Sequence, residues 1–273
     1  MGLLIIDESK CKKDGICASE CPMVIIKLKD GKGFPEMVPG GEKVCNNCGH
    51  CVSVCPHGAL SHAKVPIDKS PLIDKKLEIS EEEAVQFLRS RRSIRFFEKQ
   101  PVERDKLKRL IEIARYAPTG GNREIVEWTV FTDGERISEI AAHTLEWMRK
   151  VMAKAPQSVP PYFPGIIAAW DMGYNAVTWS APVLIVASAP KEANTGMVDV
   201  ALALSYLDLA APKLGLGTCW AGLVEGALQG SAALRESVGL PDGHPYHYPM
   251  MVGYPKPKYF RLPERKAPKI NWI

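Results

Sequence analysis

Seven of the eight cysteines lie between Cys11 and Cys55, and their spacing is the feature of the sequence that predicts chemistry most directly. The second run, from Cys45 to Pro56, has the form Cys-x2-Cys-x2-Cys-x3-Cys-Pro. Three thiolates spaced in this way wrap a tight turn around one 4Fe–4S cubane, while the fourth, followed by proline, serves a second cluster. Zinc sites usually pair two distant CxxC knuckles, so the spacing favours iron.

The first run, from Cys11 to Pro22, has the same spacing but carries Asp14 where the second cysteine belongs. A carboxylate is a harder donor than a thiolate, and two possibilities stay open. Either Asp14 supplies an oxygen to the fourth iron, or the cluster is 3Fe–4S and Asp14 lies in a solvated turn. Such clusters transfer single electrons, so we expect this module to feed electrons to the rest of the chain.

Together the two runs resemble a two-cluster bacterial-type ferredoxin over residues 1 to about 62. Ferredoxins of this type cross their ligands, so that the last cysteine of each run binds the other cluster. The resemblance therefore implies one cluster held by Cys11, Asp14, Cys17 and Cys55, and a second cluster held by Cys21, Cys45, Cys48 and Cys51.

Three later segments suit a flavin phosphate and ring. Residues 91–95 hold three arginines and Ser93, and guanidinium groups bind phosphate through two parallel hydrogen bonds. The loop at 117–123 and the segment at 214–222 are rich in small residues, which let a backbone approach a planar ring closely. A basic cluster alone is weak evidence, because most such clusters are solvated.

In order and spacing, these segments and the Gly253-Tyr254-Pro255 stretch with its basic tail resemble the nitroreductase family of FMN enzymes, over residues 80 to 270. The resemblance implies a homodimer with two FMN sites at the subunit interface, each built from both chains. It implies phosphate and ribityl contacts from Arg91, Arg92, Ser93 and Arg95, ring contacts from Pro118, Thr119, Gly120, Asn122, Trp220, Ala221, Gly222 and Leu223, and phosphate closure by Arg265, with Lys258 and Arg261 as further candidates.

One residue and one longer segment are expected near the flavin ring. Family members often carry glutamine where this chain has Glu124, whose carboxylate either disfavours negative charge on reduced flavin or points to solvent. The family also places a variable, substrate-covering segment between about residues 140 and 180. Its aromatic side chains are candidates to cover the flavin: Tyr162, Phe163, Trp170 and Tyr174.

The pattern of apolar residues predicts the elements that must position these groups. A capping box at Ser80–Glu83 opens a helix toward Ser90. A second helix follows Pro101 and stops at Pro118, and a buried helix at 198–214 ends at Gly215. Strands are expected at 127–132, 183–189 and 250–254, with residues 244–248 as a proline-bent surface loop. The mixed order of helices and strands predicts an α+β fold, a ferredoxin-like module fused to a nitroreductase-like domain.

Composition sets the outer limits. The 273 residues have a net charge of +4, 46% hydrophobic and 24% charged residues, which excludes a disordered or collagen-like chain and argues against nucleic-acid binding. No signal peptide or membrane span is apparent, which predicts a cytoplasmic protein. Arginine begins only at Arg89, whereas the cysteines cluster before it. We expect an iron–sulfur domain at 1–65, a linker at 66–79 and an FMN domain at 80–273.

These patterns predict an FMN-dependent oxidoreductase that takes electrons through iron–sulfur clusters and reduces a nitroaromatic, quinone or enone acceptor. The donor is reduced ferredoxin or NAD(P)H, although the sequence has no GxGxxG dinucleotide motif. We find no side chain that must act as a nucleophile, because the cofactor supplies the chemistry. One alternative is an electron-transfer or redox-sensing protein without significant turnover. Another is a zinc-stapled binding module fused to a degenerate reductase.

Overall fold

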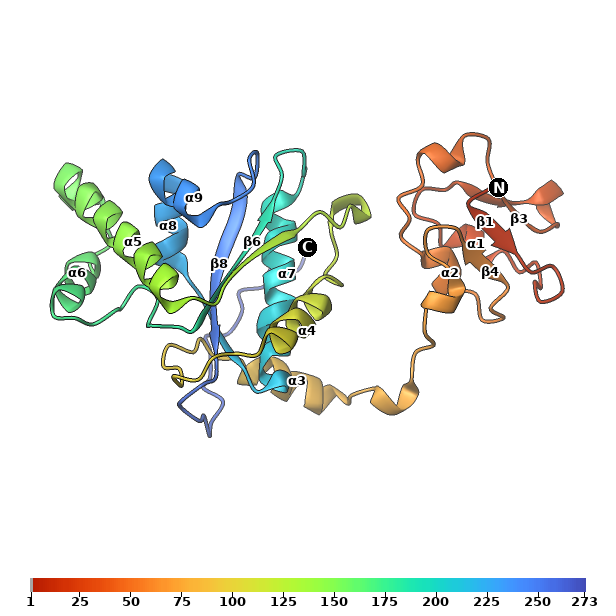
Figure 1. The fold of residues 1–273 in the computed structure, drawn as a ribbon. Coiled ribbons are helices and arrows are strands. Elements are labelled where there is room, and N and C mark those ends of the chain that lie inside the picture. The colour runs from red at the N-terminus through yellow and green to blue at the C-terminus, as the bar shows by residue number, and fades with distance from the viewer. Residues whose placement is uncertain (1) are drawn as a thin grey trace. The chain divides into compact units, whose positions relative to one another are not determined.

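The computed structural model describes residues 2–273, which divide into two compact units (Figure 1). The N-terminal unit comprises the chain up to Ile79 together with residues 121–123, and the C-terminal unit comprises residues 80–120 and 124–273. Within residues 2–273, no helix has the length and apolar character that crossing a bilayer requires.

As far as the structure describes it, from Gly2 on, the N-terminal unit is built from two small antiparallel sheets and two one-turn helices. Strand β1 (Leu4–Ile6) pairs with β4 (Leu60–His62), and β2 (Ile26–Leu28) pairs with β3 (Pro35–Met37). The helices are α1 (Ile16–Ser19) and α2 (His50–Ser53). Single 3-10 turns at Lys29–Gly31, Gly41–Lys43, Ile67–Lys69 and Lys75–Leu77 connect these elements and lead out of the unit.

The two cysteine runs fold as backbone copies of each other. Gly15 and Gly49 precede α1 and α2 in the left-handed conformation, with φ of 76° and 73°. Lys13 and Asn47, two residues before these glycines, also have positive φ, 57° and 53°. Glycine carries no Cβ penalty in this region of φ/ψ space, so it lets each run close its tight turn.

The C-terminal unit is organised by a four-stranded sheet. Its strands lie in the order β5 (Glu127–Phe131), β6 (Val183–Ala189), β8 (Tyr246–Gly253) and β7 (Gly217–Trp220), and every neighbouring pair is antiparallel. All seven residues of β6 are buried. A strand that is apolar on both faces must be covered by helices on both sides.

Helices cover both faces of this sheet, so the unit has three layers (Figure 1). On one face lie α4 (Arg104–Ala114) and α7 (Gly196–Ala210), with Val183 and Ile185 of β6 packed in the same core. On the other lie α5 (Gly134–Lys154), α8 (Gly222–Gly230) and α9 (Ala232–Val238), with α6 (Phe163–Asp171) against α5. Leu184 and Val186 point to that second core, as strand alternation requires.

The arginine-rich segment is held along β7. It follows α3 (Glu81–Ser90), whose N-terminus has the predicted capping box between Ser80 and Glu83. Ser93 pairs in parallel with Thr218, and the backbone N–H of Ile94 donates to the carbonyl of Thr218 at 2.8 Å. This pairing fixes residues 91–95 beside the strand that ends at Trp220.

The predicted α+β class and elements are confirmed, with two differences in extent. Helix α7 ends at Ala210 and continues as a 3-10 turn to Leu214, before Gly215 with φ of 73°. The surface loop expected at 244–248 is wrong for its second half, because β8 begins at Tyr246. His247 is buried there, and its Nδ1 lies 2.9 Å from Oε2 of Glu225 on α8. Tyr246, His247 and Tyr248 pair with residues 187–189 of β6, and this pairing with a distant segment makes a loop-like sequence part of the strand.

Candidate functional site

The cysteines of the N-terminal unit surround two separate cavities. The first cluster cavity, of about 340 Å³, is lined by Cys11, Asp14, Cys17 and Cys55, among others. The second cluster cavity, of about 350 Å³, is lined by Cys21, Cys45, Cys48 and Cys51. Each cavity therefore gathers three positions of one run and the last cysteine of the other, the same crossed sets that the ferredoxin resemblance implies.

The donor set suits iron–sulfur clusters. A cubane spreads its ligands over several irons, and soft thiolates are its usual donors. Burial raises the pKa of the Cys51 thiol to about 11 and also raises that of Cys17. Because a metal must bind the thiolate form, cluster assembly releases these protons.

Asp14 lies in the wall of the first cluster cavity at the position of the missing cysteine. Its Oδ1 accepts the backbone N–H of Ile16 at 3.2 Å, and its Oδ2 lies 3.8 Å from Nε2 of His57. The side chain is 45% exposed, so water also reaches it. This geometry is compatible with both alternatives, a carboxylate ligand and a solvated turn beside a three-iron cluster.

His62 borders the second cluster cavity, and we did not single it out from the sequence. It is the last residue of β4, and strand alternation places it on the same inward face as Leu60. Its Nε2 lies 3.6 Å from Sγ of Cys45, and burial lowers the pKa of the ring. The alternation of apolar and polar residues in the segment after Cys55 could have indicated a strand there. Which face of that strand points inward is decided by its pairing with β1.

In the C-terminal unit, residues from three predicted flavin-contact positions line one cavity of about 660 Å³, which we call the Arg91 cavity. It contains Arg91 and Ser93 from the arginine segment and Trp220 from the end of β7. The remaining lining residues come from α3 and α7: Leu88, Ser205, Asp208 and Leu209. Guanidinium, hydroxyl and indole groups are donors that suit the phosphate and ribityl oxygens of a flavin nucleotide.

Asp208 organises this cavity and was not predicted as a site residue. It is 4% exposed, and its Oδ2 lies 3.5 Å from Nη1 of Arg91 and accepts the indole N–H of Trp220 at 3.2 Å. Its Oδ1 accepts the hydroxyl of Thr218. A buried charge is retained when it is paired and hydrogen-bonded, as here. The signal in the sequence was that Asp208 is one of two carboxylates in a largely apolar helix.

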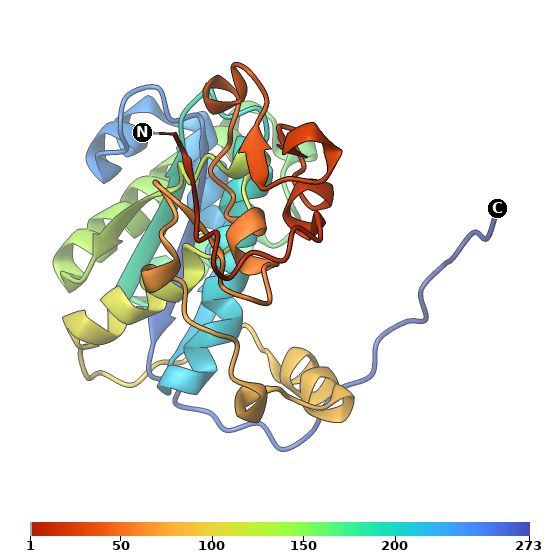
Figure 2. The ribbon, with the colours of Figure 1, turned by 90° about the vertical axis from the view of Figure 1, so that its right-hand side faces the viewer.

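The other predicted phosphate contacts lie outside the Arg91 cavity. Nη1 of Arg92 donates to the carbonyls of Arg89 and Arg91 at 2.8 and 2.6 Å, at the C-terminus of α3. Arg95 is exposed. The tail after β8 extends away from the body of its unit in Figure 2, and all three of its predicted contacts are exposed: Lys258, Arg261 and Arg265.

The loop expected against the flavin ring is anchored to the start of α7. The backbone N–H of Gly120 donates to Oδ1 of Asp199 at 3.1 Å, and the hydroxyl of Thr195 donates to the same oxygen at 2.9 Å. A Cβ on Gly120 would lie 2.1 Å from that hydroxyl oxygen, so the approach requires glycine. Glu124 has φ of 51°, and its N–H donates to Oγ1 of Thr119 at 3.0 Å.

A single chain does not bring all the predicted flavin contacts together. The loop meets α7 at Asp199, in its first turn, whereas the Arg91 cavity lies around Asp208, near its last. At 1.5 Å per residue, these two positions are about 13 Å apart along the helix axis. Of the other ring contacts, Ala221 is buried and Pro118 and Gly222 are exposed, while Asn122 and Leu223 are half-buried.

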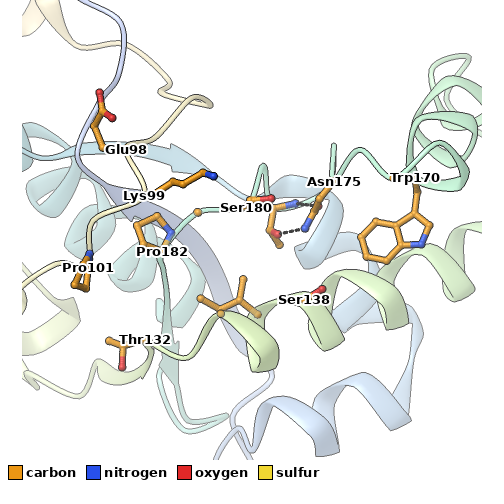
Figure 3. Close-up of a pocket in the computed structure, with 14 residues that line it drawn as sticks. Glu98, Lys99, Pro101, Thr132, Ser138, Trp170, Asn175, Ser180 and Pro182 are labelled. Atoms are coloured by element: carbon orange, nitrogen blue, oxygen red, sulfur yellow. Dashed lines mark hydrogen bonds between the residues drawn. The ribbon is translucent and has the colours of Figure 1, made fainter.

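A further open cavity of about 1430 Å³ lies elsewhere in the C-terminal unit (Figure 3). Lys99, Ser138 and Asn175 line it, with Trp170 of the predicted covering segment. Trp170 is the one candidate flavin-covering residue in this lining, and none of the predicted phosphate, ribityl or ring contacts belongs to it. Phe163 is 4% exposed and packs in the core beside α5, so within one chain it is not free to cover a ligand.

Comparison with known proteins assigns both units. Residues 9–60 match the model of the 4Fe–4S dicluster domain, and residues 88–254 match that of the nitroreductase family. A protein of Archaeoglobus fulgidus named NADH dehydrogenase/NAD(P)H nitroreductase is 25% identical over 179 residues, which are 64% of this chain and 87% of that protein.

Solved structures share the fold of the C-terminal unit. A nitroreductase with bound FMN from Bacteroides fragilis matches with a TM-score of 0.56 and 21% identity, covering 70% of this chain and 98% of that one. One with bound FMN from Desulfitobacterium hafniense gives a TM-score of 0.57 and 21% identity, covering 72% and 100%. Since the family match spans well over half of the sequence, the chain belongs to the nitroreductase family.

Proposed function

We propose that the protein is an FMN-dependent reductase that receives electrons through two iron–sulfur clusters and passes them to a small organic acceptor. The observation that carries the proposal is the presence, in one chain, of two crossed cysteine cavities and of the donor-lined Arg91 cavity. When bound, the clusters carry single electrons, and FMN exchanges single electrons with them and a hydride or electron pair with the acceptor.

The residues divide this work by their chemistry. The crossed cysteine sets hold the clusters, with Asp14 at the variable position of the first. Arg91 and Ser93 donate to the phosphate and ribityl oxygens, while Asp208 orients Arg91 and the indole of Trp220. Side chains that bind a ligand generally need supporting hydrogen bonds from neighbouring residues to hold them in the binding geometry.

A homodimer would complete the flavin site. Helix α7 is apolar on nearly every side, yet one face remains partly exposed: Val198, Leu202, Ser205, Tyr206 and Leu209. A helix that is hydrophobic all round is expected to be buried. If two α7 helices pack antiparallel about a two-fold axis, the Asp199 end of one chain meets the Asp208 end of the other. The loop at 118–124 would then reach the partner's Arg91 cavity.

The donor and acceptor follow from the chemistry of an open flavin site. Reduced ferredoxin is the expected donor to the clusters. NAD(P)H, which appears in the name of the Archaeoglobus relative, is the expected direct donor to FMN. Nitroaromatics, quinones and enones are the acceptor classes to test. Cysteines used as iron ligands also suit a reducing compartment such as the cytoplasm.

The test is anaerobic purification, followed by measurement of iron, sulfide and FMN and by turnover assays with each donor. We expect two clusters and one FMN per chain. A Cys48→Ser variant should lose most ferredoxin-driven turnover but keep its FMN and its NAD(P)H-driven turnover, while Ser53→Ala, an exposed change on α2, should keep all three. A chain that binds neither iron nor FMN contradicts the proposal.

The electron-transfer or redox-sensing alternative predicts a different outcome of the same assay. A fully loaded protein would then reduce each acceptor no faster than free FMN at the same concentration. Turnover well above that of free FMN, sensitive to Arg91→Ala, favours the reductase.

A further inference from the structure

The second cluster cavity contains a buried imidazole aimed at one of its thiols. His62 is 2% exposed, and its Nε2 lies 3.6 Å from Sγ of Cys45, within hydrogen-bonding range for sulfur. Its ring lines the cavity together with the four cysteines assigned to the second cluster. The sheet fixes the position of His62, because His62 is the last residue of β4 and pairs with Leu4 of β1.

A second contact determines which ring nitrogen carries the proton. The backbone N–H of Lys64 donates to Nδ1 of His62 at 3.1 Å. A backbone amide can only donate, so Nδ1 is an acceptor and is unprotonated. The proton of the imidazole is then on Nε2, and the group that faces Cys45 is an N–H donor.

The first cluster cavity differs at the matching position. His62 is the seventh residue after Cys55, and Leu28 is the seventh after Cys21, at the end of the equivalent strand β2. Leu28 lines the first cavity as His62 lines the second. A leucine side chain has no proton to donate, so the two halves of a repeated backbone place different groups beside their clusters.

We propose that His62 donates a hydrogen bond from Nε2–H to the thiolate of Cys45 and thereby raises the reduction potential of the second cluster. Reduction adds negative charge to the cluster and its sulfurs, and a hydrogen-bond donor to sulfur stabilises the form with more negative charge. The burial of His62 keeps water from competing for its Nε2–H and strengthens the interaction. His62 would act through Cys45 and not on the iron directly, so it is a positioning residue for the second cluster.

The first experiment is a redox titration of the full, cluster-loaded chain followed by EPR. In His62→Leu, which gives the second cavity the side chain found in the first, we expect the midpoint of the second cluster to become more negative and that of the first to stay unchanged. His62→Gln retains an amide N–H and should shift less. His57→Leu, a histidine of the first cavity, should leave the second midpoint in place. An unchanged second midpoint in His62→Leu overturns the proposal.

A second experiment does not use the His62→Leu variant, so its outcome does not depend on whether that variant assembles its clusters. The chain is labelled with 15N in its histidine rings, reduced and studied by pulsed EPR. We expect a weak 15N coupling on the second cluster, which is lost in His62→Gln and retained in His57→Gln. Three results overturn the proposal: no coupling, a coupling that survives His62→Gln, or one strong enough for a direct iron–nitrogen bond.

The inference rests on the proposed ligand set, and the two can fail separately. If Cys48→Ser leaves both clusters intact, the ligand assignment is wrong. If Cys48→Ser removes the second cluster but His62→Leu leaves its midpoint in place, only the role of His62 is wrong.

Discussion

Asp208 lines the Arg91 cavity and contacts three donors at once, namely the guanidinium of Arg91, the hydroxyl of Thr218 and the indole of Trp220. An amide in its place has one acceptor oxygen and no charge, so at least one donor would lose its partner. A hydrogen bond to a charged group contributes about 1.5–3 kcal/mol, and 1.4 kcal/mol corresponds to about tenfold in affinity.

We therefore expect Asp208→Asn to raise the Kd for FMN by about tenfold or more, measured by flavin fluorescence titration. Asp105→Asn, an exposed change on α4, is the matched control and should bind FMN like the unmodified chain. An Asp208→Asn protein that binds FMN with unchanged affinity would mean that Arg91 and Trp220 hold their positions without this carboxylate.

At the scale of the elements, the arginine segment depends on its close contact with β7. A Cβ on Gly217 of β7 would lie 2.5 Å from Cγ1 of Ile94, a buried residue of the arginine segment. Overpacking of this kind costs about 1–3 kcal/mol. The strain would fall on the backbone that carries Arg91 and Ser93.

Gly217→Ala should therefore lower the Tm of the C-terminal unit by roughly 2–12 °C and weaken FMN binding, measured by calorimetry and flavin titration. At Gly134, in the first turn of α5, a Cβ meets nothing within 4 Å. Gly134→Ala should consequently be neutral or slightly stabilising. Equal effects of the two changes would show that crowding at Ile94 is not the cause.

At the scale of the whole molecule, the exposed face of α7 predicts self-association. Val198 is 56% exposed in the first turn of this helix. A glutamate there suits the positive end of the helix dipole, so Val198→Glu should leave the single chain folded. It should nevertheless oppose burial of that face, since an unpaired charge would lose its water.

We expect the unmodified protein to sediment at about twice its chain mass of 30.1 kDa, and Val198→Glu to sediment as a monomer that has lost most of its FMN. The exposed change Val44→Glu, in the N-terminal unit, should preserve both mass and flavin. A Val198→Glu protein that remains dimeric would exclude α7 as the interface.

The two units should also differ in their dependence on iron. Among the described residues of the N-terminal unit, the hydrophobic core cluster has six buried members, two of them cysteines, Cys17 and Cys51. So small a core rarely stabilises a fold without a staple such as a metal site. The C-terminal unit has two much larger cores, one on each face of its sheet.

Oxidative removal of the clusters from the full chain should therefore abolish hydrogen-exchange protection in β1 and β4 while leaving β6 and β8 protected, as measured by mass spectrometry. The control is the same chain carried through the procedure without oxidant. Persistent protection of β1 and β4 in iron-free protein would show that the small core is sufficient by itself.

The features that the sequence predicted correctly depend on neighbours in the chain. The capping box at Ser80 needs only Glu83, three residues on, and the apolar run at 183–189 matches the bounds of β6. The cysteine spacing is equally local, because each run closes its own turn at Gly15 or Gly49. The domain limits expected at 65 and 80 and the roles of the flavin contacts stay predictions.

Other features came from contacts between distant segments, and only the fold decided them. His62 meets Cys45, Asp208 meets Arg91 and Trp220, and His247 meets Glu225 and pairs with Ser188 of β6. A local pattern specifies which residue types line a turn, a strand or a helix face, because those neighbours are linked through the backbone. It does not specify which polar group on another element will meet them, since that depends on strand register and on how helices pack across the sheet.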